Sequence, residues 1–332
     1  MRNLNAAWLM MTVVVVVVAG CAPDAPHDNP LDPASPNRKI VGNLGGKVLT
    51  LFSLSAGISG ALVTIEGTNQ AVLTATDGSF DFSSAPSGDI AVVITKSSYL
   101  SDTIYLKLAV GGNLDTSVHL DALPLVDSAR IATSMIDQWY PGPVYIDTVS
   151  AAVTDPDGFL DINTVYVCID SLTFAMTRSA GDVFQVAINA DSLPNQDPQW
   201  IVGKQLEVFA VDQEKGVGRS SGFYVTRTIE SEPKPTSPQS ADTITTGFPT
   251  FEWDPPTLSF DYTFQLKVVS LAGGAQTLVW SKAGISSSIF SYDFHDSGDS
   301  LADGEYYWTV AAIDQFGNSS RSKEAAFIVR SQ

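Results

Sequence analysis

The chain has 332 residues, enough for two or three domains, and 44% of them are hydrophobic, which is ample for packed cores. Eighteen Lys and Arg against 36 Asp and Glu give a net charge of −18, which disfavours nucleic acid and anionic membrane surfaces as partners. Of the acids, 28 are Asp and only 8 are Glu, a balance that favours strands and turns over helices.

The first 20 residues have the pattern of an export signal. Arg2 precedes an apolar stretch of 13 residues, 6–18, which is too short for a comfortable membrane span. The stretch ends in Val18, Ala19, Gly20 and Cys21. These four residues resemble the lipobox of bacterial lipoproteins.

This resemblance implies cleavage before Cys21 and acylation of that cysteine, for example with palmitate, as the membrane anchor. Because Ala22 rather than Asp follows the cysteine, it also implies sorting to the outer membrane or cell surface. Two or more acyl chains hold a protein at a bilayer. The alternatives are an uncleaved signal anchor or ordinary secretion with Cys21 left free.

Residues 21–37 are expected to form a tether behind the lipidated cysteine. Five prolines occur in the sixteen residues 22–37, interleaved with Asp. Proline fixes the backbone and removes hydrogen-bond donors, so a packed helix or a central strand is excluded here.

Residues 38–123 alternate short apolar runs with turn signals, as in a β-sandwich. Asp77-Gly78 predicts a tight hairpin turn. The order "GALVTI…TATDGSFDFSSAPSGDIAVVITKSSYLS" closely resembles the carboxypeptidase regulatory-like module, a transthyretin-like sandwich without peptidase chemistry. The same architectural group includes starch-binding domains, but this stretch has no Trp, and only Tyr99 and Tyr105 as tyrosines. A spacer role is therefore expected.

Residues 124–229 carry a second strand series that resembles an immunoglobulin-like sandwich in its pattern. Residues 230–332 resemble a fibronectin type III domain, in which Trp253 is the core tryptophan and Tyr306 forms a tyrosine corner. "VFAVDQEKGVGRSSGFYV" begins at Val208 and "VAAIDQFGNSSRSKEAAFIV" begins 102 residues later, at Val310. This repeat supports tandem modules over one large fold. The predicted fold class is all-β, with tandem β-sandwiches behind a cleaved signal peptide and a proline-rich tether.

No catalytic pattern accompanies these modules. The three histidines, His27, His119 and His295, lie in a tether, a strand and a loop, away from any nucleophile motif. Cys168 lies in an alternating strand pattern, where a cysteine is typically a small half-buried side chain. The sequence therefore predicts no enzyme activity and requires no cofactor.

One loop carries hard oxygen ligands at spacings suited to calcium. "DPDGFLD" places Asp155, Asp157 and Asp161 around Gly158. It lacks the other positions of an EF-hand loop, and "DPDG" is also simply a good turn. The acids Asp293, Asp296, Asp299 and Asp303 form a weaker set of the same kind.

Three aromatic residues in connections are candidates for ligand binding. Trp139 and Tyr140 precede two prolines, and Trp200 lies in a second connection. Aromatic rings held in turns stack on sugars or anchor protein interfaces. The alternative is that they plug the end of a sandwich core.

The leading hypothesis is a non-enzymatic surface lipoprotein with a structural, adhesive or scaffold role. Its partners are the membrane, reached through the N-terminal lipid, and a surface protein or polysaccharide. The alternative hypothesis is a carbohydrate-binding accessory lipoprotein of a polysaccharide-handling system.

Overall fold

A computed structural model of the chain describes residues 26–28, 32, 34, 35, 41–51 and 55–331. Regular structure in these residues consists of strands and short 3₁₀ turns, so the all-β prediction is confirmed. No described helix is long and apolar enough to cross a membrane. Contacts divide the chain into two compact units, with β1 to β7 mainly in unit 1 and the remaining strands in unit 2.

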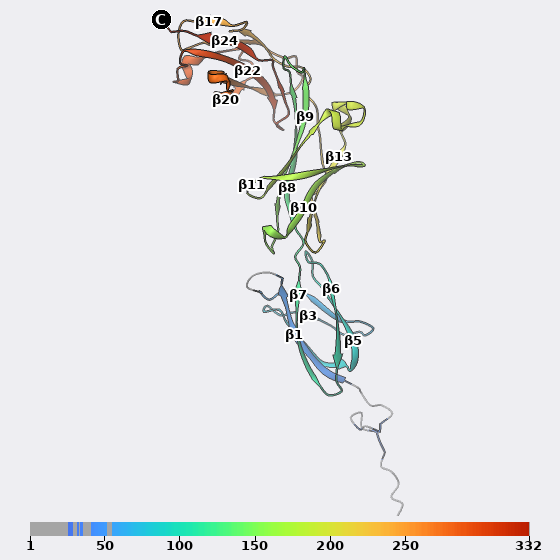
Figure 1. Ribbon diagram of the computed structural model, residues 1–332. Coiled ribbons are helices and arrows are strands. Elements are labelled where there is room, and N and C mark those ends of the chain that lie inside the picture. The colour runs from blue at the N-terminus through green and yellow to red at the C-terminus, as the bar shows by residue number, and fades with distance from the viewer. Residues whose placement is uncertain (1–25, 29–31, 33, 36–40, 52–54, 332) are drawn as a thin grey trace, which may run out of the picture. The chain divides into compact units, whose positions relative to one another are not determined.

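Unit 1 is a β-sandwich of two sheets with the orders β4-β1-β7 and β3-β2-β5-β6 (Figure 1). Its strands are β1 (Val41–Thr50), β2 (Leu62–Ile65), β3 (Ala71–Leu73), β4 (Ser79–Pro86), β5 (Gly88–Thr95), β6 (Asp102–Leu108) and β7 (Asn113–Leu120). Alternate residues of β1 and β5 are buried, among them Leu44, Val48, Val92 and Ile94. This period of two places the core between the sheets.

The turn predicted at Asp77-Gly78 is present, but it does not join two paired strands of one sheet. Gly78 has φ 79°, a conformation that glycine adopts without strain. A Cβ atom on Gly78 would lie 2.2 Å from the carbonyl oxygen of Val48. The turn connects β3 to β4, which belong to different sheets, because a sandwich core needs the chain to cross between its layers.

The second sandwich begins unit 2 and is closed by a strand that changes sheets. Its strands are β8 (Leu125–Ile136), β9 (Val144–Thr154), β10 (Ile162–Ile169), β11 (Leu172–Ala180), β12 (Val183–Asn189), β13 (Gln205–Asp212), β14 (Val217–Arg219) and β15 (Phe223–Tyr224). The first half of β11 pairs with β10 and its second half pairs with β12. Apolar residues that include Val149, Val167 and Val208 form the core between the layers.

The third sandwich has a core dominated by aromatic rings. Its strands are β16 (Lys234–Ser237), β17 (Asp242–Ile244), β18 (Thr250–Asp254), β19 (Tyr262–Ser270), β20 (Thr277–Ser286), β21 (Ser291–Asp293), β22 (Gly304–Asp314), β23 (Ser319–Arg321) and β24 (Ala325–Val329). Trp253 is buried, as expected of the core tryptophan. The hydroxyl of Tyr306 donates a hydrogen bond of 2.9 Å to the carbonyl oxygen of Ala302, so the tyrosine corner is present.

A backbone ladder joins the second and third sandwiches within unit 2. Strands β8 and β23 pair in parallel, with Ser134 opposite Ser319. Two buried side chains continue this contact, since Asn318 Oδ1 accepts from the backbone N–H of Thr133 at 3.0 Å and from its hydroxyl at 3.2 Å. We call this set of contacts the seam.

Candidate functional site

The predicted lipidation site lies outside the described residues. This holds for Cys21, for Val18, Ala19 and Gly20 before it, and for most of the tether. The membrane anchor therefore stays a prediction from the sequence.

The predicted calcium loop connects β9 to β10. Asp155 Oδ1 accepts a 2.8 Å hydrogen bond from the backbone N–H of Asp157. The chain then passes through Gly158, at φ 114°, into the short turn η1 (Phe159–Asp161). A carboxylate oxygen of Asp157 and one of Asp161 thereby come within 4.8 Å of each other.

A third acid from a distant part of the sequence joins this loop. Asp121 lies between β7 and β8, and one of its carboxylate oxygens is within 4.8 Å of those of Asp157 and Asp161. The segment is held in place by its backbone: Asp157 Oδ2 accepts from the N–H of Ala122 at 2.6 Å. The loop and the segment before β8 thus share one cluster of oxygens.

The turn between β13 and β14 adds two more acids beside Asp121. Oxygens of Asp212 and Glu214 lie within 4.8 Å of each other and of Asp121. Asp212 Oδ1 accepts a 2.6 Å hydrogen bond from the backbone N–H of Gly216, which closes the turn. A Cβ atom at Gly216 would lie 2.2 Å from Asp212 Oδ2, so a side chain at this position would displace the Asp212 carboxylate. We call Asp121, Asp155, Asp157, Asp161, Asp212 and Glu214 together the acid cluster.

Three carboxylates of the acid cluster are buried and have at least one oxygen without a hydrogen-bond partner. The exposed fractions of Asp121, Asp161 and Asp212 are 6%, 3% and 0%. Both carboxylate oxygens of Asp121 and Asp161 and the Oδ2 atom of Asp212 accept no hydrogen bond within ordinary geometry. Buried charges without partners are costly, and native proteins rarely leave them so.

The electrostatic environment of the cluster opposes ionisation. Burial, followed by the charges of Asp212 and Asp161, raises the pKa of Asp121 to about 7. Burial raises the pKa of Asp155 to about 6, although the hydrogen bond from Asp157 acts against it. Desolvation and the charge of Asp212 raise the pKa of Asp161, while the nearby N–H of Gln213 acts against this. The site therefore favours any species that brings positive charge.

The donor set of the cluster defines what it can hold. Every ligand atom offered is a carboxylate oxygen, with no histidine nitrogen or cysteine sulfur in either convergent group. Such oxygens suit hard divalent cations and do not suit zinc or copper.

The local pattern "DPDGFLD" predicts three of these acids but not Asp121, Asp212 and Glu214. Asp121 falls within the range predicted for the first sandwich, and Asp212 falls in the repeated Asp-Gln turn. The repeat itself carried a signal, because Gly216 and Glu214 stand where the later copy has Asn318 and Phe316. Compared with the later turn, the earlier turn therefore lacks the amide of Asn318 and has the carboxylate of Glu214 in place of the Phe316 ring. These two differences change the groups that surround its aspartate.

Two acids of the weaker set in the third sandwich accept hydrogen bonds from backbone N–H groups. Asp293 Oδ1 accepts from the N–H of His295 at 2.9 Å, and Asp303 Oδ1 accepts from the N–H of Ser331 at 2.8 Å. In the described part of the chain, these acids form no group of three converging oxygens.

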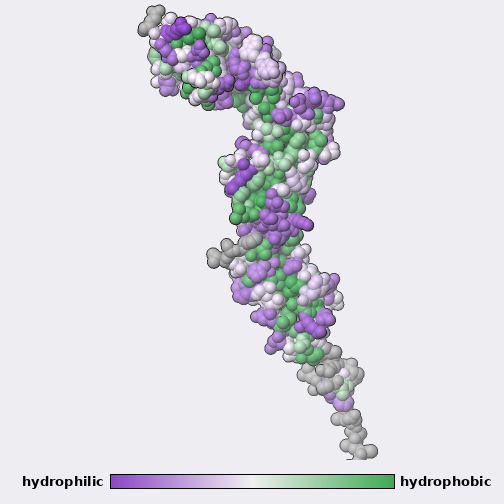
Figure 2. All heavy atoms as spheres, in the orientation of Figure 1, coloured by the Kyte–Doolittle hydropathy of each residue, from purple (hydrophilic) through white to green (hydrophobic). Residues whose placement is uncertain are grey.

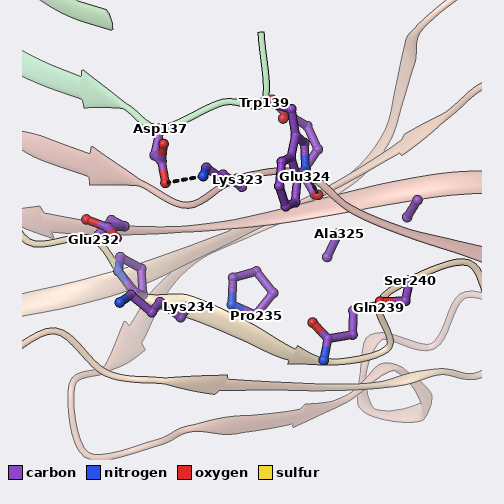
Figure 3. Close-up of a pocket in the computed structure, with 12 residues that line it drawn as sticks. Asp137, Trp139, Glu232, Lys234, Pro235, Gln239, Ser240, Lys323, Glu324 and Ala325 are labelled. Atoms are coloured by element: carbon purple, nitrogen blue, oxygen red, sulfur yellow. Dashed lines mark hydrogen bonds and ion pairs between the residues drawn. The ribbon is translucent and has the colours of Figure 1, made fainter. Parts of the chain in front are cut away.

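A groove beside the seam holds the predicted aromatic residue Trp139 (Figure 3). Its volume is about 470 Å³. Trp139 is 72% exposed, its Nε1–H donates to the carbonyl oxygen of Glu324 at 2.9 Å, and the ammonium of Lys323 lies 4.7 Å from its ring centroid. Pro235 and Gln239 line the opposite side of the groove. The result is an exposed aromatic face held in one orientation among polar groups.

The other two predicted aromatic residues do not line this groove. Tyr140 is exposed beside Trp139, whereas Trp200 is half-buried against the core of the second sandwich. The ammonium of Lys204 lies 4.3 Å from the Trp200 ring centroid. On the face shown in Figure 2, hydrophobic and hydrophilic residues both reach the surface.

The other candidates for chemistry have ordinary surroundings. His119 is exposed on β7, and the ring of His295 stacks on Phe248 with centroids 4.3 Å apart. Cys168 is half-buried in β10, as the alternating pattern predicted.

Comparison with known proteins found no matching family model and no matching curated protein. Similar solved structures include the fibronectin domains FN1–FN3 of chicken CNTN1, at 13% identity and TM-score 0.33, covering 83% of this chain and 92% of that one. A DUF3823 family protein from Bacteroides ovatus is 15% identical at TM-score 0.24, covering 55% and 98%. A putative carbohydrate binding protein from Bacteroides uniformis is 10% identical at TM-score 0.24, with the same coverage. Likenesses this weak do not bear on function.

Proposed function

We propose that the chain is a non-enzymatic, lipid-anchored surface protein with a structural or adhesive role. In this proposal Cys21 carries the lipid, and the β-sandwiches behind the tether hold a binding surface away from the membrane.

The proposed structural role is supported by the seam between the second and third sandwiches. Besides the pairing of β8 with β23, the backbone N–H of Asp137 donates to the carbonyl oxygen of Arg321 at 2.9 Å, and Arg321 Nη2 donates to the carbonyl oxygen of Asp137 at 3.2 Å. Modules joined by backbone hydrogen bonds and buried side chains resist bending more than modules joined by a free linker. Such a joint suits a protein that holds a surface in a fixed position.

Metabolic labelling with a fatty-acid analogue tests the anchor. We expect the full chain to be labelled and to fractionate with membranes. Cys21→Ala should lose both properties, because the other cysteine, Cys168, does not lie next to the apolar stretch 6–18. Cys168→Ala is the matched control and should keep both. An unlabelled wild-type chain would overturn the anchor. A separate experiment, cross-linking on intact cells, tests whether the chain has a protein partner.

The groove favours a second candidate function, the binding of a polysaccharide. The exposed face of Trp139 is fixed by its hydrogen bond to Glu324, and Asp137, Lys323 and Gln239 offer polar groups around it. Rings held in this way stack on the apolar faces of sugars, while polar neighbours bind the hydroxyls.

Retention of the chain on insoluble polysaccharides tests the second candidate. Trp139→Ala should lose retention if the groove binds glycans. Tyr105→Ala removes a similarly exposed ring from β6, outside the groove, and this variant should still be retained on the polysaccharide. If both variants behave as the wild type does, the groove is not a sugar site.

A further inference from the structure

The acid cluster contains no internal cation that could balance it. The ion pairs among the described residues involve other acids, namely Asp32, Asp77, Asp137, Asp170, Asp314 and Glu324. Asp121, Asp161 and Asp212 therefore combine burial, missing partners and like-charged neighbours. Such a set is neutralised either by protonation or by a cation from outside the chain.

The chain contains its own reference for this site, because the turn of Asp212 recurs at Asp314. The N–H of Asp212 donates to the carbonyl oxygen of Gly216 at 3.2 Å, and the N–H of Asp314 donates to that of Asn318 at 3.0 Å. In both turns the aspartate Oδ1 accepts the reciprocal N–H, at 2.6 Å and 3.0 Å. The two turns therefore share one backbone and can be compared at the second carboxylate oxygen.

The second oxygen has opposite surroundings in the two turns. Asp314 Oδ2 accepts from Asn318 Nδ2 at 3.0 Å and lies 3.6 Å from the guanidinium Nε of Arg227. Arg227 belongs to the segment that leads into the third sandwich. In the second sandwich the corresponding segment supplies Asp121, and glycine replaces the asparagine. Asp314 therefore has the guanidinium of Arg227 beside it, whereas Asp212 has the carboxylate of Asp121.

We propose that the acid cluster binds Ca²⁺, with Asp121 shared between the Asp157–Asp161 and Asp212–Glu214 groups. Calcium takes six to eight oxygen ligands in flexible geometry, and carboxylates are its commonest protein ligands. Magnesium requires a stricter octahedron and retains several waters, which a buried set of crowded carboxylates does not accommodate.

Calcium would fasten the segment before β8 onto the β13–β14 turn. This segment already packs closely there, since a Cβ atom on Gly218 would lie 1.8 Å from the carbonyl oxygen of Pro124. Asp121 and Asp212 repel each other when both are charged. A calcium ion coordinated by both carboxylates would replace this repulsion by attraction to the shared cation. This assignment goes beyond the proposed function and does not depend on the lipid anchor or the glycan groove.

Calcium titration of the full chain, purified with EDTA, tests the proposal. We expect the melting temperature of unit 2 to rise by about 5 to 10 °C at a Ca²⁺ concentration 100 times the Kd. Asp121→Asn should abolish this rise. It should also raise the melting temperature in EDTA, because it removes one charge from the cluster, and this opposite sign separates loss of binding from misfolding.

The matched control is Asp191→Asn, which changes an exposed aspartate of the same sandwich and should keep the full calcium response. No calcium response in the wild-type chain, or a full response in Asp121→Asn, would overturn the proposal. An equal response to Mg²⁺ would overturn the assignment to calcium.

Discussion

The turns of Asp212 and Asp314 show how one backbone motif can bury an aspartate in two ways. The later copy satisfies its second oxygen inside the protein, through Asn318 and Arg227. The earlier copy has Gly216 and faces Asp121 and Glu214 instead. The same turn backbone therefore occurs with either surroundings, and the side chains around the aspartate, both within the turn and from the segment packed against it, decide how its charge is balanced.

The largest expected effect is the loss of Asp314. Asp314→Ala removes the acceptor of the Phe316 and Asn318 N–H groups, bonded at 2.9 and 3.0 Å, and leaves Arg227 without its partner. We expect a loss of about 3 to 5 kcal/mol in the free energy of unfolding, measured by urea denaturation in EDTA.

Asp212→Ala, measured in the same way, is the comparison. It loses the hydrogen bond from Gly216 but also relieves repulsion, so we expect a loss of only about 1 kcal/mol. Equal losses in the two variants would contradict the difference that we assign to the two sites.

A further buried aspartate, Asp147 in β9, belongs to neither turn. It is 5% exposed, and burial raises its pKa to about 7. Between about pH 4 and pH 7 the unfolded chain ionises this group while the folded chain keeps it protonated, so the free energy of unfolding falls as the pH rises. The fall is on the order of 2 to 4 kcal/mol and levels off above the folded pKa.

Asp147→Asn tests this pH dependence, because the amide stays neutral at every pH. The variant should be more stable than the wild type at pH 8 and should show no such advantage at pH 4 in urea denaturation. A constant difference across this range would show that Asp147 does not titrate as expected. If the difference instead grows between pH 4 and pH 8, a proton balances Asp147, whereas Arg227 balances Asp314.

A smaller effect should be the same in both copies of the repeat. The N–H of Val208 donates to Ser220 Oγ and that of Val310 donates to Ser322 Oγ, both at 3.0 Å. Each Ser→Ala change leaves a buried N–H unsatisfied, and we expect losses of about 1 to 2 kcal/mol in both. Losses that differ by more than twofold would show that the two copies are not equivalent outside the aspartate.

The parts of the structure that sequence predicted are those specified by local patterns. Alternating apolar residues predicted the strands, and a tryptophan within such a strand predicted the buried Trp253. The DPDG loop was visible because Asp155, Asp157 and Asp161 are close in the chain. Asp121 and Asp212 join them only after three segments fold together, and no local pattern in "LDAL" or "VDQE" records that contact.

Comparing the two copies of the repeat gives some information on such long-range contacts. A substitution at Glu214 provides the most specific test of the difference between the Asp212 and Asp314 turns. Glu214 stands where the later copy has Phe316, and it is exposed, so a longer side chain fits without repacking. Glu214→Lys would bring an ammonium beside Asp121 and Asp212, as Arg227 does for Asp314. We expect the melting temperature in EDTA to rise by a few degrees and the response to calcium to shrink, both measured by thermal unfolding. Glu66→Lys makes the same change of charge on the exposed surface of unit 1 and should alter neither quantity. If the two lysine variants give the same result, net charge and not the local cluster governs the stability of the earlier turn.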